Sequence, residues 1–400
     1  MWRRIRLAFT DKTKLSQPLQ LIAFITDRCN ARCVHCFNWR AVDEGKHPGL
    51  TSEELQSLSE QLGPLLTVGI SGGEPFLRDD VSSIYALFAS QNELGEIDIP
   101  TNGLLPERVY SEVRRMLSQK NPTLIAITLS LDGLEDLHDR IRGVPGSFAR
   151  LQETYDALVR LKHEFPDNGP LIKIGTTLCN WNVRQIPDLI EWIQREMPLV
   201  DFHNFEIMRG KPRDDRIGPP NADDLEWVKP HIFQVWRDYA FYGRSRPVQS
   251  WIALGLKRFV FTMYVEMLRQ RKQLIPCYAG RTSAVVDAES NLYFCELRES
   301  IGNLQQRSFQ DLWHGEEAES IRASIERGDC YCVHSCFQQK NVFLNPRLWP
   351  HVVFYLLTGR FTLPPASHIQ PAVPRRDNAR SDSGNDNDPV APNEGRENAS

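Results

Sequence analysis

The sequence predicts an α/β fold in which a partial barrel of parallel strands precedes a small cysteine-rich domain. Between residues 20 and 210, short β-branched apolar segments alternate with longer amphipathic stretches. The chain has nine cysteines in 400 residues, and three of them directly follow the first apolar segment. Such alternation, with almost continuously apolar strands, is typical of a parallel sheet covered by helices. We therefore expect a partial (β/α)6 barrel of the TIM type, an auxiliary domain and a disordered tail.

The predicted strands are short apolar runs that end in polar or glycine-rich residues. They cover residues 19–26, 66–71, 96–100, 124–131, 171–177 and 202–208. Helices are expected between them: Thr51 and Glu54 form a capping box, and Asn182 precedes another stretch with helical periodicity.

The rest of the chain divides by composition. We expect a lead-in over 1–19, the barrel over 20–215, a helical bridge over 216–272, the auxiliary domain over 273–340, an apolar helical segment over 341–363 and a disordered tail over 364–400. The bridge carries aromatic residues at helical spacing that we expect to be core or packing residues, namely Trp227, Phe233, Trp236, Tyr239, Trp251, Phe259 and Tyr264.

The net charge and the hydropathy of the chain limit the classes of partner that we expect. A net charge of -4 gives no strong attraction to nucleic acid, so we expect none as a partner. The amino terminus lacks a signal-peptide pattern, and no apolar run approaches the roughly 20 residues of a membrane span. A reducing cytoplasm is the expected compartment, with a small molecule or a specific polypeptide as partner.

Cys29, Cys33 and Cys36 form the pattern C-x-x-x-C-x-x-C. Three thiolates can hold three irons of a [4Fe-4S] cube and leave the fourth iron free to bind a substrate or cofactor. A disulfide framework fits poorly, because the chain is long and its cysteine count is odd. A structural zinc site usually takes four ligands and stays open as an alternative.

Polar clusters follow three further predicted strands: Gly72-Gly73-Glu74, Thr101-Asn102-Gly103 and Ser130-Leu131-Asp132-Gly133. In a strand-helix barrel they meet the cysteine triplet at the carboxyl edge of the sheet, where active sites are built.

Taken in this order, residues 29–36, 71–75 and 130–133 resemble the motifs of the radical S-adenosylmethionine (SAM) superfamily over about half the chain. The resemblance implies that the amino and carboxylate groups of SAM chelate the open iron. It also implies that one electron breaks a carbon-sulfur bond, giving methionine and a 5'-deoxyadenosyl radical that abstracts hydrogen from a substrate.

The resemblance also implies roles for the motif residues. Gly72 and Gly73 let the backbone approach the methionyl end, where exposed peptide groups and Glu74 receive the ammonium. Ser130 and Asp132 would face the ribose hydroxyls.

Three further residues complete the expected SAM site. Arg142 matches an arginine that contacts the SAM carboxylate in related maturases, with a surface ion pair as the alternative role. His35 occupies a position that often stacks on adenine, and Asn102 would line the same cavity.

The carboxy-terminal cysteines resemble the SPASM and twitch extensions of radical SAM maturases, which bind auxiliary [4Fe-4S] clusters. They are Cys277, Cys295, Cys330, Cys332 and Cys336. We expect one twitch-like auxiliary cluster on Cys277, Cys295 and two of the other three, with His334 as an alternative ligand and zinc as an alternative metal. The SPASM pattern has glycine where this chain has Ser290, and Cys179 is expected to be a buried thiol.

The expected function is that of a radical SAM enzyme acting on a peptide or protein, reduced by a partner such as flavodoxin or ferredoxin. One alternative is a small metabolite or a lipid or glycan precursor as substrate, with residues 341–361 contacting a membrane surface. Another is a non-catalytic iron-sulfur electron carrier or sensor, which would have no use for Gly72-Gly73-Glu74 beside the cluster.

Overall fold

The computed structural model describes residues 9–10, 15–45, 47, 49–241 and 247–365. The predicted tail lies outside the described residues from 366 on, as does most of the lead-in before residue 15.

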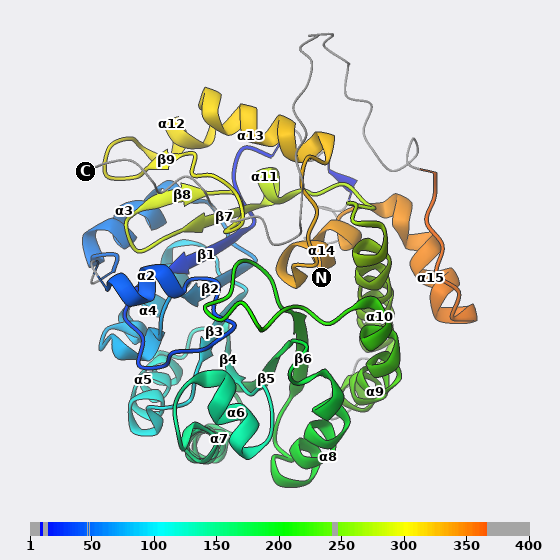
Figure 1. The fold of residues 1–400 in the computed structure, drawn as a ribbon. Helices are drawn as coiled ribbons and strands as arrows, with labels where there is room; N and C mark the ends of the chain where they lie inside the picture. Colours follow the sequence, from blue (N-terminus) through cyan, green and yellow to red (C-terminus); the bar gives the residue numbers. More distant parts are fainter. Residues whose placement is uncertain (1–8, 11–14, 46, 48, 242–246, 366–400) are drawn as a thin grey trace.

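The six predicted strands form one parallel sheet that curves into a partial barrel (Figure 1). The prediction is confirmed with small shifts of the strand ends: β1 is Gln20–Phe24, β2 Thr67–Ser71, β3 Glu96–Thr101, β4 Leu124–Ser130, β5 Leu171–Leu178 and β6 Phe202–Ile207. Neighbours in sequence are neighbours in the sheet, from β1 at one side to β6 at the other. All their carboxyl ends therefore lie at one edge.

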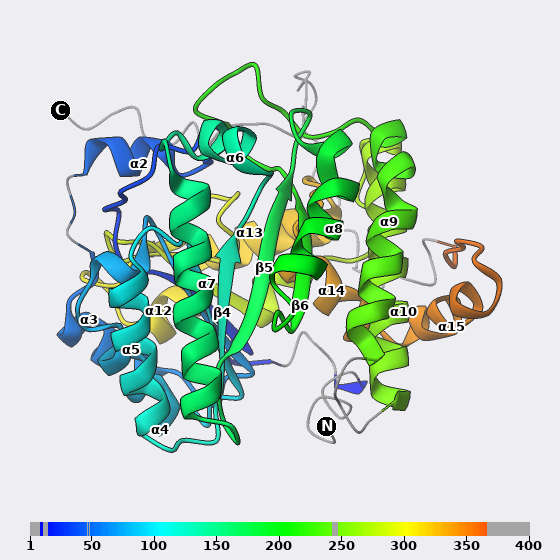
Figure 2. The same cartoon turned by 90° about the horizontal axis from the view of Figure 1, so that it is seen from below.

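Helices cover the outer face of this sheet, and Figure 2 shows α5, α7 and α8 lying across it. Residues alternate along β3, β5 and β6 between buried positions and half-buried ones. The buried set packs under helices that are apolar on one side. The covering helices are α3 (Ser52–Gln61), α4 (Val81–Gln91), α5 (Pro106–Ser118), α7 (Ser147–Glu164) and α8 (Ile186–Glu196), and the short α6 (Glu135–Arg142) sits at the carboxyl edge.

The two predicted helix starts have different physical causes. Thr51 and Glu54 form the expected capping box at the start of α3. Asn182 does precede a helical segment, but its side chain makes no capping bond. It donates to the carbonyls of Asp132 and Thr177, each at 2.8 Å. Asn182 therefore joins the loops after β4 and β5 at the barrel mouth.

The auxiliary region extends the same sheet, which the sequence did not predict. β7 (Ser283–Val286) pairs in parallel with β1, and β8 (Asn291–Tyr293) and β9 (Gly302–Asn303) follow in antiparallel order. Strands of two to four residues give almost no periodicity to detect. Because β7 lies beside β1, the auxiliary domain is placed next to the cysteine loop. Its helices are α11 (Ala279–Thr282), α12 (Phe309–Trp313), α13 (Glu316–Arg327) and α14 (Ser335–Phe343).

The bridge consists of two helices, α9 (Ala222–Phe241) and α10 (Pro247–Gln270), as expected. Trp236, Phe259 and Tyr264 are buried, in agreement with the prediction. Trp227 is outside the core: it is 40% exposed, and Arg184 packs over its ring at 4.5 Å. The side chain of Trp251 lies outside the described part of the chain.

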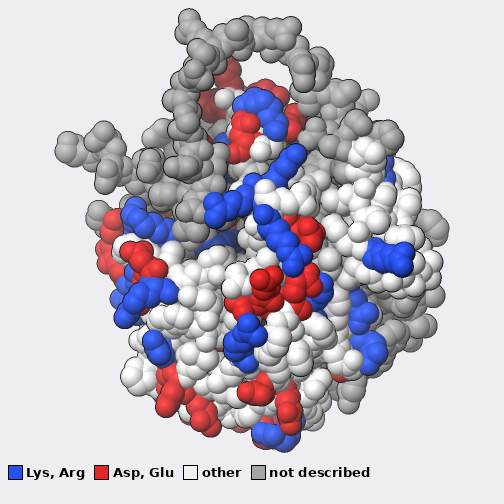
Figure 3. All heavy atoms as spheres, turned by 45° about the vertical axis from the view of Figure 1, so that its right-hand side comes forward, with Lys and Arg blue, Asp and Glu red and all other residues white. Residues whose placement is uncertain are grey.

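The apolar segment after the auxiliary domain forms α15 (Trp349–Thr358), which packs against α10. Three of its side chains, Val353, Phe354 and Leu357, are exposed. Among the described residues, no helix is both long and apolar enough to cross a bilayer. Acidic and basic groups are interspersed on this side of the molecule, as Figure 3 shows.

Ser290 shows why glycine belongs at its position in the SPASM pattern. Its φ is 66°, in the left-handed region, and it is buried, with its hydroxyl donating to Glu54 Oε1 at 2.7 Å. That backbone conformation costs an L residue about 1–2 kcal/mol.

We predict that Ser290→Gly changes the free energy of unfolding by less than about 1 kcal/mol, because relief of strain offsets the lost hydrogen bond. Ser290→Val should destabilise by about 2–3 kcal/mol, since a β-branched residue at positive φ is more strained and leaves Glu54 without this donor. Urea denaturation compares the two variants. A larger loss for glycine than for valine would contradict this account of the turn.

Candidate active site

The cysteine triplet lies in the loop between β1 and α2 (Trp39–Glu44), at the carboxyl edge of the sheet. Cys29, Cys33 and Cys36 are free thiols and partly exposed. Burial raises the pKa of Cys29 to about 11 and that of Cys36 to about 12. The thiolate forms of these cysteines therefore need a bound metal such as iron to stabilise their charge.

The glycine motif packs directly against the entry to the cysteine loop. Gly73 N–H donates to the carbonyl of Thr26 at 2.7 Å, and Glu74 N–H donates to that of Arg28 at 2.8 Å. A Cβ on Gly72 would lie 2.3 Å from the Thr26 oxygen, and φ at Gly72 is 123°. Only glycine allows this approach. The motif thus fixes where the cysteine loop begins, a role that the sequence did not reveal.

Glu74 binds protein groups on two neighbouring loops. Its Oε1 accepts from the Thr101 hydroxyl at 2.8 Å, and its Oε2 accepts from Asn102 N–H at 2.7 Å. The residue is only 1% exposed, and burial raises its pKa to about 7. Asn102 in turn donates to Asn30 Oδ1 at 2.8 Å and lies 4.0 Å from Cys29 Sγ. Glu74 therefore holds the loop after β3 beside the cysteines.

Asp132 is the buried anchor of the opposite wall. It is fully buried; its Oδ1 accepts from Thr177 N–H at 2.8 Å, and its Oδ2 lies 2.6 Å from Arg142 Nη2. Burial would raise its pKa, but Arg142 and His35 outweigh burial and lower it. The Ser130 hydroxyl, two residues earlier, is half-buried and has no protein partner among the described residues. Ser130 and Asp132 are both expected from the sequence to bind the ribose, but only the Ser130 hydroxyl is free to do so.

Arg142 and His35 both present unsatisfied polar atoms beside the cysteines. Arg142 Nη1 lies 3.7 Å from Cys33 Sγ, and Arg142 Nε has no hydrogen-bond partner although it is buried. His35 Nε2 lies 3.6 Å from Asp132 Oδ2, and its Nδ1 is likewise buried without a partner. Burial lowers the pKa of His35 to about 4, so the ring is neutral at pH 7. Buried donors and acceptors without a protein partner indicate a polar ligand. Together with the three thiols, these groups fit an iron-sulfur cluster that binds SAM.

The auxiliary cysteines gather between α10, β8 and α14. Burial first, and then Cys277 and Cys330, raise the pKa of Cys332 to about 12. Burial, Glu296, Cys332 and Cys277 similarly raise the pKa of Cys295.

Cys336 lies in the first turn of α14, next to His334 and Arg209. Within the described part of the chain, no three cysteine, histidine or acidic side chains converge as ligands of one ion do. In a four-iron cube each thiolate binds a different iron, so the thiolates stand further apart.

A buried ion network joins the barrel to the auxiliary domain. Arg209 donates to Glu206 at 3.1 Å and to Glu296 at 3.2 Å, and His334 contacts the same Glu296 oxygen. Glu206 lies in β6 and Arg209 just after it, while Glu296 follows Cys295 and His334 precedes α14. Acidic and basic groups alternate along this network, so they neutralise one another. No sequence motif predicts this network, because it joins residues far apart in the chain.

Family models match the two halves of the chain separately. The Radical SAM superfamily model matches residues 24–193, which contain the cysteine, glycine and Ser130-to-Asp132 motifs. The chain contains a radical SAM domain. A second model, SPASM, described as an iron-sulfur cluster-binding domain, matches residues 277–338. These domains imply a [4Fe-4S] cluster with SAM and auxiliary iron-sulfur clusters, which removes the zinc alternative for the auxiliary site.

The named proteins that this chain resembles differ in the products that their names state. The chain is 31% identical to Fe-coproporphyrin III synthase of Methanosarcina barkeri over 184 residues, 45% of this chain and 42% of that protein. It is 25% identical to AlbA of Bacillus subtilis, an antilisterial bacteriocin subtilosin biosynthesis protein, over 78% of this chain and 63% of the relative. The matched segments thus span less than two thirds of each relative.

A solved structure shares the fold of both halves. Streptococcus suis SuiB, bound to its precursor peptide SuiA, aligns with a TM-score of 0.54 at 15% identity, covering 80% of this chain and 70% of SuiB. The radical SAM barrel with its SPASM extension is therefore the fold of this chain.

Proposed function

We propose that this chain is a radical SAM enzyme that abstracts a hydrogen atom from a peptide or protein substrate. The observation that carries the proposal is the set of unsatisfied polar atoms on His35 and Arg142 beside the three free thiols. When bound, the cluster and SAM supply one-electron cleavage of SAM and a 5'-deoxyadenosyl radical.

The site residues divide into groups that contact SAM and groups that position them. Arg142 offers a cationic fork to the SAM carboxylate, and the buried carboxylate of Asp132 holds that fork in place. The Ser130 hydroxyl is available to the ribose. The neutral ring of His35 lies against Asp132, where it can border the adenine.

Peptide groups near Gly72 and Gly73 are proposed to receive the SAM ammonium, while the Glu74 side chain ties this turn to Thr101 and Asn102. Asn102 lies at the edge of the same site, close to Cys29.

The auxiliary ligands are proposed to be Cys277, Cys295 and two of Cys330, Cys332 and Cys336. Cys332 is favoured among the three because it interacts with thiols of the other groups. Cys277 and Cys330 both raise the pKa of the Cys332 thiol, and Cys332 in turn raises the pKa of Cys295. An auxiliary cluster held by these cysteines would lie beside the substrate cavity, where it can exchange electrons with the bound substrate.

A peptide substrate is supported by the names of two similar proteins, the subtilosin biosynthesis protein and SuiB with its precursor peptide. It is also supported by an open cavity between the barrel and the SPASM domain. A small carboxylated metabolite is the second candidate, because the relative with 31% identity is Fe-coproporphyrin III synthase. A simple electron carrier would leave the polar atoms around Arg142 without use.

The substrate class is tested with protein reconstituted with iron and sulfide under anaerobic conditions and reduced with dithionite. A short peptide encoded next to the gene, prepared with deuterated side chains, should change in mass and transfer deuterium to 5'-deoxyadenosine. Iron-coproporphyrin III serves as the parallel candidate. Deuterium transfer from no peptide, together with a mass change of the tetrapyrrole, would overturn the peptide assignment.

A further inference from the structure

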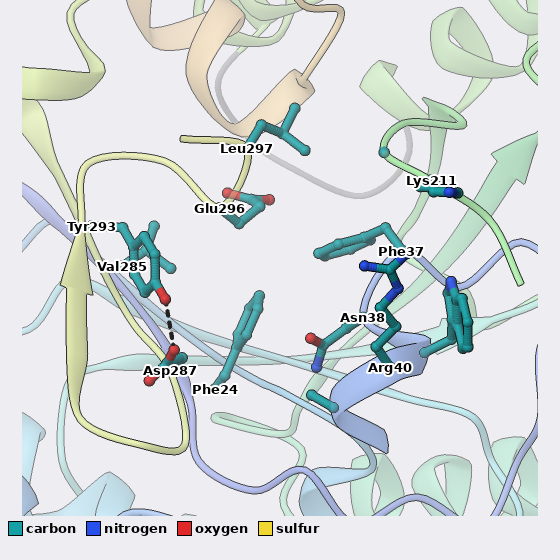
Figure 4. Close-up of a pocket in the computed structure, with 13 residues that line it drawn as sticks. Phe24, Phe37, Asn38, Arg40, Lys211, Val285, Asp287, Tyr293, Glu296 and Leu297 are labelled. Atoms are coloured by element: carbon teal, nitrogen blue, oxygen red, sulfur yellow. Dashed lines mark hydrogen bonds between the residues drawn. The ribbon is translucent and has the colours of Figure 1, made fainter. Parts of the chain in front are cut away.

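One cavity lies where the cysteine loop faces the SPASM domain, and no motif predicted it. Its barrel wall is formed by residues 37–41, just after Cys36, and by Gly210 and Lys211 after β6. Its other wall is the hairpin of β7 and β8, from Val285 to Leu297 (Figure 4). The cavity therefore adjoins the SAM-binding cysteines on one side and Cys295 on the other.

Two cations on the barrel wall have no counter-charge. Arg40 and Lys211 are exposed, and neither has an ion-pair partner among the described residues. Arg40 only lies near the ring of its neighbour Trp39, at 5.5 Å. In Figure 4 the Arg40 side chain extends toward Phe37. Both cations line the cavity and are exposed, so they are free to pair with a ligand at its rim.

The acidic residues that line the cavity are already engaged. Glu296 is paired with Arg209 and His334. Asp287 accepts from the backbone and side chain of Asn291 and from the Tyr293 hydroxyl, which fixes the hairpin turn. Asp287 lies across the cavity from Arg40 in Figure 4. The barrel wall thus attracts anions, while the two acids of the hairpin wall are held by other groups, Glu296 by cations and Asp287 by neutral donors.

Aromatic rings form the floor between these walls. Phe24 and Phe37 lie 6.3 Å apart, centroid to centroid, and their rings point into the cavity (Figure 4). Arg209 lies over the Phe37 ring at 5.2 Å and keeps it in place. An apolar group of a ligand would pack on these rings while an adjoining anionic group reached the cations.

We propose that this cavity is a carboxylate-binding subsite for the substrate. Arg40 and Lys211 bind an acidic group, and Phe24 and Phe37 hold the apolar group next to it. The inference rests on the peptide-modifying function proposed above and narrows its substrate class to acidic segments with an apolar neighbour. The acidic group can be a side chain or the end of a chain, since both present the same carboxylate.

The test uses three synthetic peptides and the full chain, reconstituted anaerobically. Acetyl-Phe-Asp-Phe-amide carries a side-chain carboxylate, acetyl-Phe-Asn-Phe with a free end carries a terminal one, and acetyl-Phe-Asn-Phe-amide is neutral. Calorimetry should show at least one acidic peptide binding about tenfold or more tightly than the neutral one, as charge-assisted hydrogen bonds allow. The acidic peptide that binds more tightly identifies the source of the carboxylate.

The double variant Arg40→Gln with Lys211→Gln should lose this preference. Its matched control, Arg160→Gln with Arg195→Gln, removes two exposed arginines from α7 and α8 and should keep it. The subsite is overturned by equal affinities in the wild type, by a preference that survives in the double variant, or by no binding at about 1 mM. SAM cleavage by the same wild-type preparation is measured separately, so failure of the proposed function is distinguished from failure of the subsite.

Discussion

Replacing Cys33 with alanine should lower 5'-deoxyadenosine formation at least about a thousandfold, to near the uncatalysed background. Cys33 is one of the three thiols in the loop after β1, and Arg142 reaches its sulfur. Two thiolates cannot hold three irons, so the site that leaves one iron open to SAM is lost. The measurement is chromatography of 5'-deoxyadenosine after anaerobic reduction with dithionite.

Cys179→Ala is the matched control. Cys179 is a buried free thiol, as predicted, and it packs with Ile141, Met208 and Ile217 in a small apolar cluster. Its loss should cost about 1 kcal/mol of stability and leave SAM cleavage in place. SAM cleavage that persists in Cys33→Ala would contradict the cluster assignment. An equal loss in both variants would show that any cysteine removal disables the protein.

Replacing Arg142 with methionine should destabilise the protein by about 3–5 kcal/mol and abolish measurable SAM binding. Methionine fills much of the space but leaves the fully buried Asp132 carboxylate without the cation that lies 2.6 Å from it. An unpaired buried charge is costly because nothing replaces the water that it lost. The unfolding midpoint in urea and the affinity for SAM are the two measurements.

Arg150→Met is the control for that variant, since it breaks an exposed pair with Glu153 in α7. Exposed ion pairs contribute about 1 kcal/mol or less, so its midpoint should stay close to that of the wild type. Equal stability of the Arg142 and Arg150 variants would show that Asp132 does not depend on Arg142. Normal SAM affinity in Arg142→Met would remove the arginine from the SAM site.

The parts of the fold that the sequence predicted are those with strong local signals. The strands β1 to β6 combine apolar cores with glycine or polar ends, and Thr51 with Glu54 forms a capping box within four residues. Patterns of this kind depend on neighbouring residues, so they can be recognised without tertiary information. The short strands β7 to β9 exist because β1 offers them an edge, which only the folded chain shows.

The candidate site divides in the same way. The cysteine and glycine motifs are local, and the structure brings them together at one edge of the sheet. Local motifs do not tell how deeply a side chain is buried. Glu74 and Asp132 resemble ligand contacts in sequence, but in the structure both are buried and accept hydrogen bonds from the protein. The network around Arg209 and the cations Arg40 and Lys211 likewise depend on elements that only the fold brings together.

We expect SAM to bind the iron left open by Cys29, Cys33 and Cys36. Electron paramagnetic resonance of the reconstituted, reduced protein tests it directly, with spectra taken before and after SAM is added. We predict that SAM changes the signal of one cluster, that the change is absent in Cys33→Ala, and that 5'-deoxyadenosine accumulates in the wild type only. An unchanged spectrum without 5'-deoxyadenosine, in wild-type protein with full iron content, would contradict the claim.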